Sequence, residues 1–139
     1  RFLTGTAPVL SMTALDAALA VFDDVDMAAV RHKSVALCDL MIARVEARCQ
    51  GALALASPRD GRAQGSQVSF RHEAGYAICQ ALIARGVIGD FRAPDILRFG
   101  MTPLYTRYTD VFDGVEILSD LIATGDWDKP EFHKRAAVT

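Results

Sequence analysis

One arginine stands in a stretch whose other residues are apolar or small. Along residues 96–101, strand alternation places Ile96, Arg98 and Gly100 on one face and Leu, Phe and Met on the other. The Leu/Phe/Met face is predicted to pack on a core. A guanidinium offers forked N–H donors that can hold a carboxylate by two parallel hydrogen bonds, and the neighbouring glycine leaves space for it. Arg98 is therefore a candidate carboxylate-binding residue.

Arg98 also has an ordinary structural interpretation. Its side chain can pair with Asp90 or Asp95 in the polar turn that precedes the strand, or extend to the sheet edge. The pattern of residues alone leaves both interpretations open.

Other chemistry has little support in this chain. No Gly-x-Ser-x-Gly elbow, phosphate-binding loop or dinucleotide motif occurs. The histidines stand on separate predicted elements without metal-ligand spacing, so we predict no metal site. None of the lysines lies in the apolar, strand-flanked setting that a Schiff-base lysine needs. These residues are His32, His72 and His133, and Lys33, Lys129 and Lys134. We therefore expect no catalytic residue in this chain.

Composition narrows the class of protein. A length of 139 residues with 51% hydrophobic and 23% charged residues is typical of one globular domain. The net charge of -2 gives no general attraction to nucleic acid or to an anionic membrane. No apolar stretch approaches the roughly 20 residues that a membrane-spanning helix needs. The odd set Cys38, Cys49 and Cys79 indicates buried free thiols and a cytoplasmic setting.

The elements that must position Arg98 follow from periodicity and capping signals. We predict a short amphipathic helix over 11–22 with Ser11 or Thr13 as its N-cap, and a long helix over 27–49 capped by Asp26. The basic cluster Arg31-His32-Lys33 is interpreted as a solvated face of that long helix. Further predicted elements are strands over 52–56 and 67–72, a helix over 73–85, strands at 87–88 and 96–101, a helix over 107–123, and a tail that packs through Trp127 and Phe132. This order predicts an α+β fold, with helices on one face of a small, mainly antiparallel sheet.

A longer motif around Arg98 resembles one enzyme family. The run Asp95-Ile-Leu-Arg-Phe-Gly-Met-Thr-Pro-Leu-Tyr-Thr-Arg-Tyr108, preceded by Arg85-Gly-Val-Ile-Gly-Asp-Phe-Arg92, is similar to the C-terminal part of kynureninases. Three further segments agree in order, namely Phe2-Leu-Thr-Gly-Thr-Ala-Pro8, Arg31-His-Lys-Ser34, and Ser57-Pro-Arg-Asp60 followed by Gly65-Ser-Gln67. Kynureninases are pyridoxal-phosphate enzymes of fold type I, in the aspartate-aminotransferase superfamily.

The resemblance implies roles for two residues. Arg98 would hold the α-carboxylate of the amino-acid substrate, and Thr6 would contribute to cofactor binding near the phosphate. The implied reaction is hydrolysis of L-kynurenine, or of 3-hydroxykynurenine, to anthranilate (or 3-hydroxyanthranilate) and L-alanine. It belongs to tryptophan catabolism and, through the kynurenine pathway, to NAD biosynthesis. The family is dimeric, so a homodimer is expected of the full-length protein.

The chain also departs from the family pattern. The lysine that binds the cofactor, and most phosphate-binding groups, lie upstream of the segment that this chain resembles. We therefore expect a fragment that is inactive alone, with residues 1–10 as the junction from the large domain and 11–139 as the small C-terminal domain. Two alternatives stay open: another fold type I enzyme, such as an aminotransferase or cysteine desulfurase, and a non-catalytic module for amino-acid binding or assembly.

Overall fold

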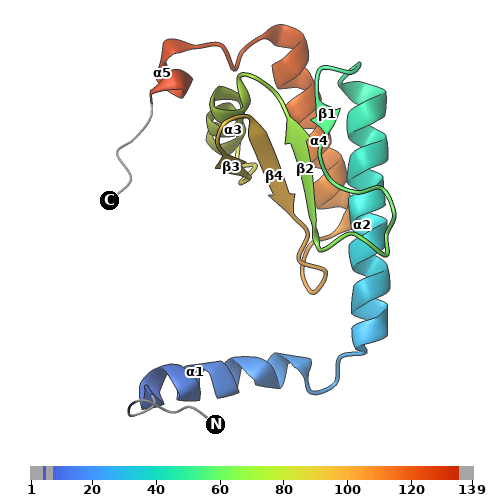
Figure 1. Cartoon of the computed structure of the whole chain (residues 1–139), viewed down its shortest axis with the longest axis vertical. Coiled ribbons are helices and arrows are strands. Elements are labelled where there is room, and N and C mark those ends of the chain that lie inside the picture. The colour runs from blue at the N-terminus through green and yellow to red at the C-terminus, as the bar shows by residue number, and fades with distance from the viewer. Residues whose placement is uncertain (1–4, 6–7, 135–139) are drawn as a thin grey trace.

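A computed structural model describes residue 5 and residues 8–134 of the chain (Figure 1). The elements in chain order are α1 (Val9–Leu19), a short 3-10 helix η1 (Ala20–Phe22), α2 (Met27–Arg48), β1 (Ala54–Leu55), β2 (Gln67–Arg71), α3 (Gly75–Ala84), β3 (Asp90–Arg92), β4 (Ile96–Gly100), α4 (Tyr108–Thr124) and α5 (Pro130–His133). The predicted order of helices and strands is confirmed, and the structure adds two short helices, η1 and α5, that were not predicted as separate elements.

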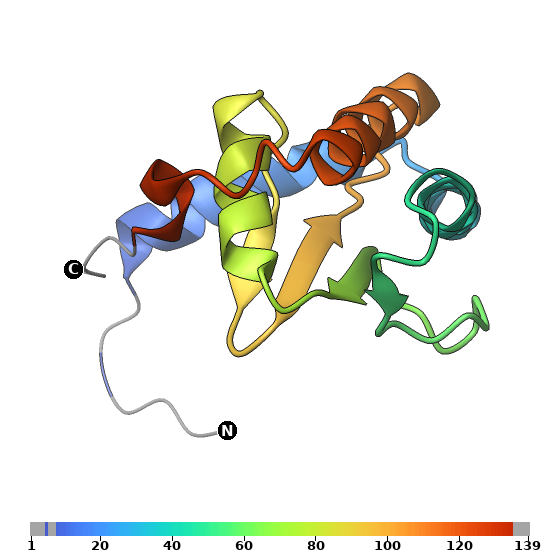
Figure 2. The ribbon, with the colours of Figure 1, turned by 90° about the horizontal axis from the view of Figure 1, so that it is seen from above.

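A four-stranded sheet holds the centre of the fold. Its strands lie in the order β1-β2-β4-β3, and every neighbouring pair is antiparallel. Figure 2 shows α2, α3 and α4 gathered on one side of this sheet. The predicted α+β architecture, with a long helix near the N-terminus and helices on one sheet face, is therefore confirmed.

The core lies between the helices and the inner face of the sheet. β2 contributes Val68 and Phe70, and β4 contributes Leu97 and Phe99, all at alternate positions as strand geometry requires. The helical stripes face them, including Leu37 of α2. Burying each large apolar side chain contributes about 1.5–3 kcal/mol, so this alternation sets which face of β4 points inward.

The predicted cap of α2 is confirmed, and a glycine follows each of α2 and α3. The Asp26 carboxylate accepts a 2.8 Å hydrogen bond from the Ala28 N–H at the start of α2. Gly51 and Gly86 follow α2 and α3 with φ of 80° and 86°, a conformation that glycine adopts without a Cβ penalty. These ends fix where the chain turns back onto the sheet.

Two predicted elements differ from the structure. The strand beside β4 is Asp90–Arg92 rather than 87–88, because Asp90 to Arg92 carry the antiparallel register with β4, whereas Ile88 is 85% exposed. The first helix begins at Val9 after Pro8, so neither Ser11 nor Thr13 is its N-cap. None of its residues is buried, so the predicted amphipathic packing is wrong for this helix.

The remaining local predictions agree with the structure. Cys38, Cys49 and Cys79 are buried free thiols. Trp127 and Phe132 pack against the core cluster and hold the C-terminal segment as far as residue 134. In the described part of the chain, no helix combines the length and apolar character needed to cross a membrane.

Candidate functional site

Arg98 projects from the sheet face that the helices leave uncovered. β4 lies between β2 and β3, so hydrogen bonds on both sides hold its backbone. Leu97 and Phe99 point into the core, while Arg98 points to the opposite face with a side chain that is 26% exposed. The predicted division of faces is confirmed, and a guanidinium is mounted on a central strand.

A polar row crosses the sheet at Arg98. Ser69 of β2 and Asp90 of β3 are its direct cross-strand neighbours. The Asp90 carboxylate accepts a hydrogen bond from Nη2 of Arg98 and forms an ion pair with it. The buried Nε of Arg98 has no hydrogen-bond partner among the described residues. The structural interpretation of Arg98, pairing with Asp90, is therefore confirmed. This pair engages Nη2 and leaves Nε without a partner among the described residues.

Two glycines shape the space around Arg98. A Cβ built at Gly100, on the same face, would have no atom within 4 Å. A Cβ at Gly89, by contrast, would lie 3.2 Å from the Arg98 carbonyl oxygen and 3.3 Å from the Phe99 ring. The residue before β3 thus packs closely against the β4 backbone, while the space beside Arg98 is open. A ligand can approach Arg98 from the Gly100 side.

Charges on this sheet face are nearly balanced. Nη1 of Arg71 donates to the two Asp95 carboxylate oxygens at 3.0 and 3.2 Å, and Nε of Arg92 lies 3.6 Å from Oδ2 of Asp90. Together with Arg98, three arginines thus face two aspartates. Such partly exposed pairs contribute roughly 0–1 kcal/mol each, so an incoming carboxylate can compete for Arg98. These five side chains carry a net charge of +1, which favours the binding of one additional anion.

Contacts from the first turns of α2 hold the loop that follows β4 and the loop that precedes β2. Lys33 of α2 donates its Nζ to the Pro103 carbonyl oxygen at 2.6 Å, and Ser34 exchanges a 2.8 Å hydrogen bond with Ser66. Arg31 donates to the Gln64 carbonyl oxygen at 2.8 Å. Arg31 and His32 are exposed, as a solvated face predicts, whereas Lys33 is half-buried and the prediction is wrong for it.

No local signal marks these contacts in the sequence. They join residues 32 to 70 positions apart, and periodicity reports only the helix that carries them. Their effect is to bring three separate motifs together beside β4: the start of α2, the 64–66 loop and the Thr102-Pro-Leu-Tyr105 loop.

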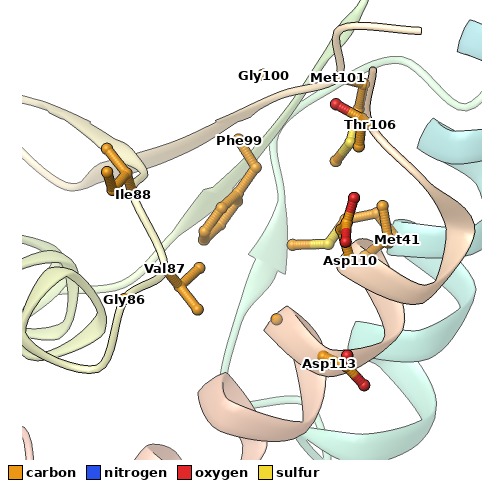
Figure 3. A pocket seen from close by; sticks show the side chains of 12 residues that line it. Met41, Gly86, Val87, Ile88, Phe99, Gly100, Met101, Thr106, Asp110 and Asp113 are labelled. Atoms are coloured by element: carbon orange, nitrogen blue, oxygen red, sulfur yellow. The ribbon is translucent and has the colours of Figure 1, made fainter. Parts of the chain in front are cut away.

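A separate pocket lies on the core side of β4. It has a volume of about 430 Å³ and is lined by side chains such as Met41, Phe99 and Met101, which converge in Figure 3. Asp110 stands at its edge, where the Arg107 guanidinium holds the pKa of that carboxyl below its usual range. Arg98 does not line this pocket, although Gly100, its neighbour on the same strand face, does.

The described residues do not form a pyridoxal-phosphate site by themselves. Lys33 is held by Pro103, Lys129 pairs with Asp126 at 3.2 Å, and Lys134 lies exposed at the end of the described chain. No lysine therefore stands in a closed pocket within residues 8–134. Burial raises the pKa of the thiols of Cys38, Cys49 and Cys79, which keeps them protonated and poorly nucleophilic at neutral pH. The described residues also hold no group of three His, Cys, Asp or Glu side chains arranged for a metal ion.

Arg98 is thus the candidate site residue whose position the structure describes. Thr6, the residue expected to contact the cofactor phosphate, lies outside the described residues. What this part of the protein can do chemically is bind and orient a carboxylate.

Comparison with known proteins decides the family. A family model described as the kynureninase C-terminal domain matches residues 30–118. The chain belongs to the kynureninase family. The kynureninases of Burkholderia mallei (strain SAVP1) and Burkholderia pseudomallei (strain K96243) are each 56% identical to it over 140 residues. The kynureninase of Pseudomonas fluorescens is 49% identical over 140 residues.

These alignments cover 100% of the chain but 34% of each relative. The chain therefore spans about one third of the length of the kynureninases it matches. The segment matched by the family model contains most of α2, the whole sheet and Arg98, whereas α1 and α5 lie outside it.

Proposed function

We propose that this chain is the C-terminal part of a kynureninase, and that Arg98 binds the α-carboxylate of the amino-acid substrate. The observation that carries the proposal is the position of Arg98 within the kynureninase-matched segment, on the sheet face that the helices leave uncovered, with a buried Nε that has no partner among the described residues. The full-length protein, meaning the gene product at the length of its relatives, would hydrolyse L-kynurenine or 3-hydroxykynurenine. Water is consumed, the bond between Cβ and the ketone carbon breaks, and anthranilate (or its 3-hydroxy form) and L-alanine are released.

Arg98 contributes binding and orientation to this reaction. Hydrogen bonds to charged groups contribute about 1.5–3 kcal/mol each, enough to fix one end of the substrate. Because β4 is paired on both sides, that end is held at a defined place relative to the sheet. Positioning of this kind lowers the barrier by restricting the substrate to reactive geometries.

Pyridoxal phosphate would be bound mainly by residues that precede this chain, with a contribution from Thr6. This agrees with the observation that lysines 33, 129 and 134 are unsuited to hold it. We further propose that the full-length protein is a homodimer of the cytoplasm that serves tryptophan catabolism.

The test uses the full-length protein, loaded with pyridoxal phosphate and supplied with kynurenine or 3-hydroxykynurenine. Release of anthranilate (or 3-hydroxyanthranilate) together with an equal amount of alanine supports the proposal. The 139-residue chain alone, with added cofactor, serves as the control and is expected to release neither product. Amino transfer or sulfur release without C–C cleavage would instead assign the protein to another fold type I activity.

A further inference from the structure

α1 carries large apolar side chains on opposite sides, and none of its residues is buried. Leu10 is 87% exposed, Val9 67%, Leu15 59% and Leu19 52%. Leu10 and Leu19 are nine residues apart, which is two and a half turns, so they lie on opposite sides of the helix. A helix with large apolar side chains on opposite sides is normally enclosed on both of those sides.

α1 has no place to be buried within the described domain. Figure 1 shows it extending away from the sheet and from the helices that cover it. The exposure continues past its end to Val21 and Phe22, up to the acidic turn at 23–26 that precedes α2. An isolated helix of this length is marginal in water, so its stability depends on a partner surface.

The comparisons indicate which surface that is. The C-terminal domain match begins at residue 30, after α1, whereas the alignments with the relatives include α1. Those relatives are about three times longer than this chain, since it covers 34% of each. The two thirds of each relative that the chain does not cover is large enough to enclose a helix.

Other occupants explain the pattern less well. A second copy docking by one face would leave the opposite side, either Leu10 or Leu19, in solvent. α1 is too short to span a bilayer, because eleven residues of helix extend roughly 16 Å at 1.5 Å per residue against a hydrocarbon core of roughly 30 Å.

We propose that α1 packs into the preceding two thirds of its own polypeptide and belongs structurally to that part. The boundary of the C-terminal domain then falls in the acidic turn at 23–26 rather than at residue 10, where the sequence places it. The proposal rests on membership of the kynureninase family and does not depend on the proposed activity.

Hydrogen exchange on the full-length protein tests the burial of α1. If α1 is enclosed, its backbone amides exchange about a hundredfold or more slowly than free-peptide rates, like those of a core helix. Exchange within a few-fold of free-peptide rates would overturn the proposal.

Photo-crosslinking identifies the occupant. A benzophenone amino acid replaces Leu15 in the full-length protein, and unlabelled and 15N-labelled copies are mixed and co-refolded before irradiation. The expected products join α1 to residues that precede this chain, and both peptides of each product carry the same nitrogen isotope. Products of mixed isotope, or products that join α1 to residues 27–134, would overturn it. The same probe at Asp39, exposed on α2, is the matched control and should give few products with the preceding residues.

Discussion

Replacing Asp90 with asparagine tests how Arg98 divides its donors between the protein and a ligand. The two side chains face each other across β3 and β4 and form an ion pair. The Asp90 side chain is 54% exposed and that of Arg98 is 26% exposed, so solvent screens the pair substantially. Asparagine keeps the shape of the side chain and removes its charge.

Two opposing effects follow from the Asp90→Asn substitution. The guanidinium loses a partner that helps to orient it, but a substrate carboxylate no longer competes with Asp90 or is repelled by it. Because β-sheet pairing on both sides of β4 already positions Arg98, we expect the loss of competition to dominate. A half-exposed pair contributes roughly 0.2–1 kcal/mol, which corresponds to a KM lowered about 1.4- to 5-fold at 1.4 kcal/mol per tenfold change.

The assay is steady-state hydrolysis of kynurenine by the full-length protein at low and high salt. KM should fall while kcat stays near its original value, and the difference should shrink at high salt because salt screens exposed charges. A KM that rises several-fold would refute this reasoning and would make Asp90 a positioning residue for Arg98.

Three further predictions concern the surroundings of Arg98 and the stability of the domain. Gly100→Val fills open space beside Arg98, so it should raise KM about tenfold or more and leave the unfolding midpoint unchanged. A lowered unfolding midpoint with an unchanged KM would contradict this prediction. Thr6→Ala should mildly weaken retention of pyridoxal phosphate during dialysis, and equal retention would remove that role. Burial lowers the pKa of His72, so below about pH 6.5 the unfolded state binds more protons than the folded state, and stability falls as pH is lowered through that range. His72→Asn should flatten this dependence of the unfolding midpoint on pH. Equal slopes in the variant and the unsubstituted protein would contradict the prediction. His32→Asn, on an exposed face of α2, is the control.

The sheet face to which the Arg98 side chain points could be predicted from sequence, because it depends on a local pattern. Alternation along β4 buries Leu97, Phe99 and Met101 and directs Arg98 to the other face. Burial of three large side chains outweighs any competing register, so a period of two decides the orientation.

The neighbouring strand could not be placed in the same way. Val87 and Ile88 are the apolar pair, yet the residues that hydrogen-bond to β4 are Asp90 to Arg92. Edge-strand pairing follows the geometry of the turn before Ile96 rather than local hydrophobicity. The sequence therefore leaves Asp90 and Asp95 as alternative partners of Arg98, and the strand register selects Asp90.

Long-range contacts account for what sequence reasoning missed. Arg31 and Lys33 hold loops 33 and 70 residues further along the chain, so no local window contains both partners. The packing of α1 was mispredicted for a related reason. The helix forms as its pattern predicts, but no surface of the described domain buries it.

The central claim is that Arg98 binds the substrate α-carboxylate, and Arg98→Lys in the full-length protein tests it most directly. The dissociation constant of kynurenine is compared with that of the corresponding amine, which lacks the carboxylate. Arg92→Lys is the matched control, since that arginine lies on the same sheet and near the same aspartate, 3.6 Å from Asp90.

Loss of the bidentate contact should weaken kynurenine binding by about 10- to 150-fold, from roughly 1.5–3 kcal/mol, and leave binding of the amine unchanged. The absorbance of the bound cofactor should also stay unchanged. Equal weakening of both ligands, unchanged binding of kynurenine, or loss of the cofactor would contradict the carboxylate role of Arg98.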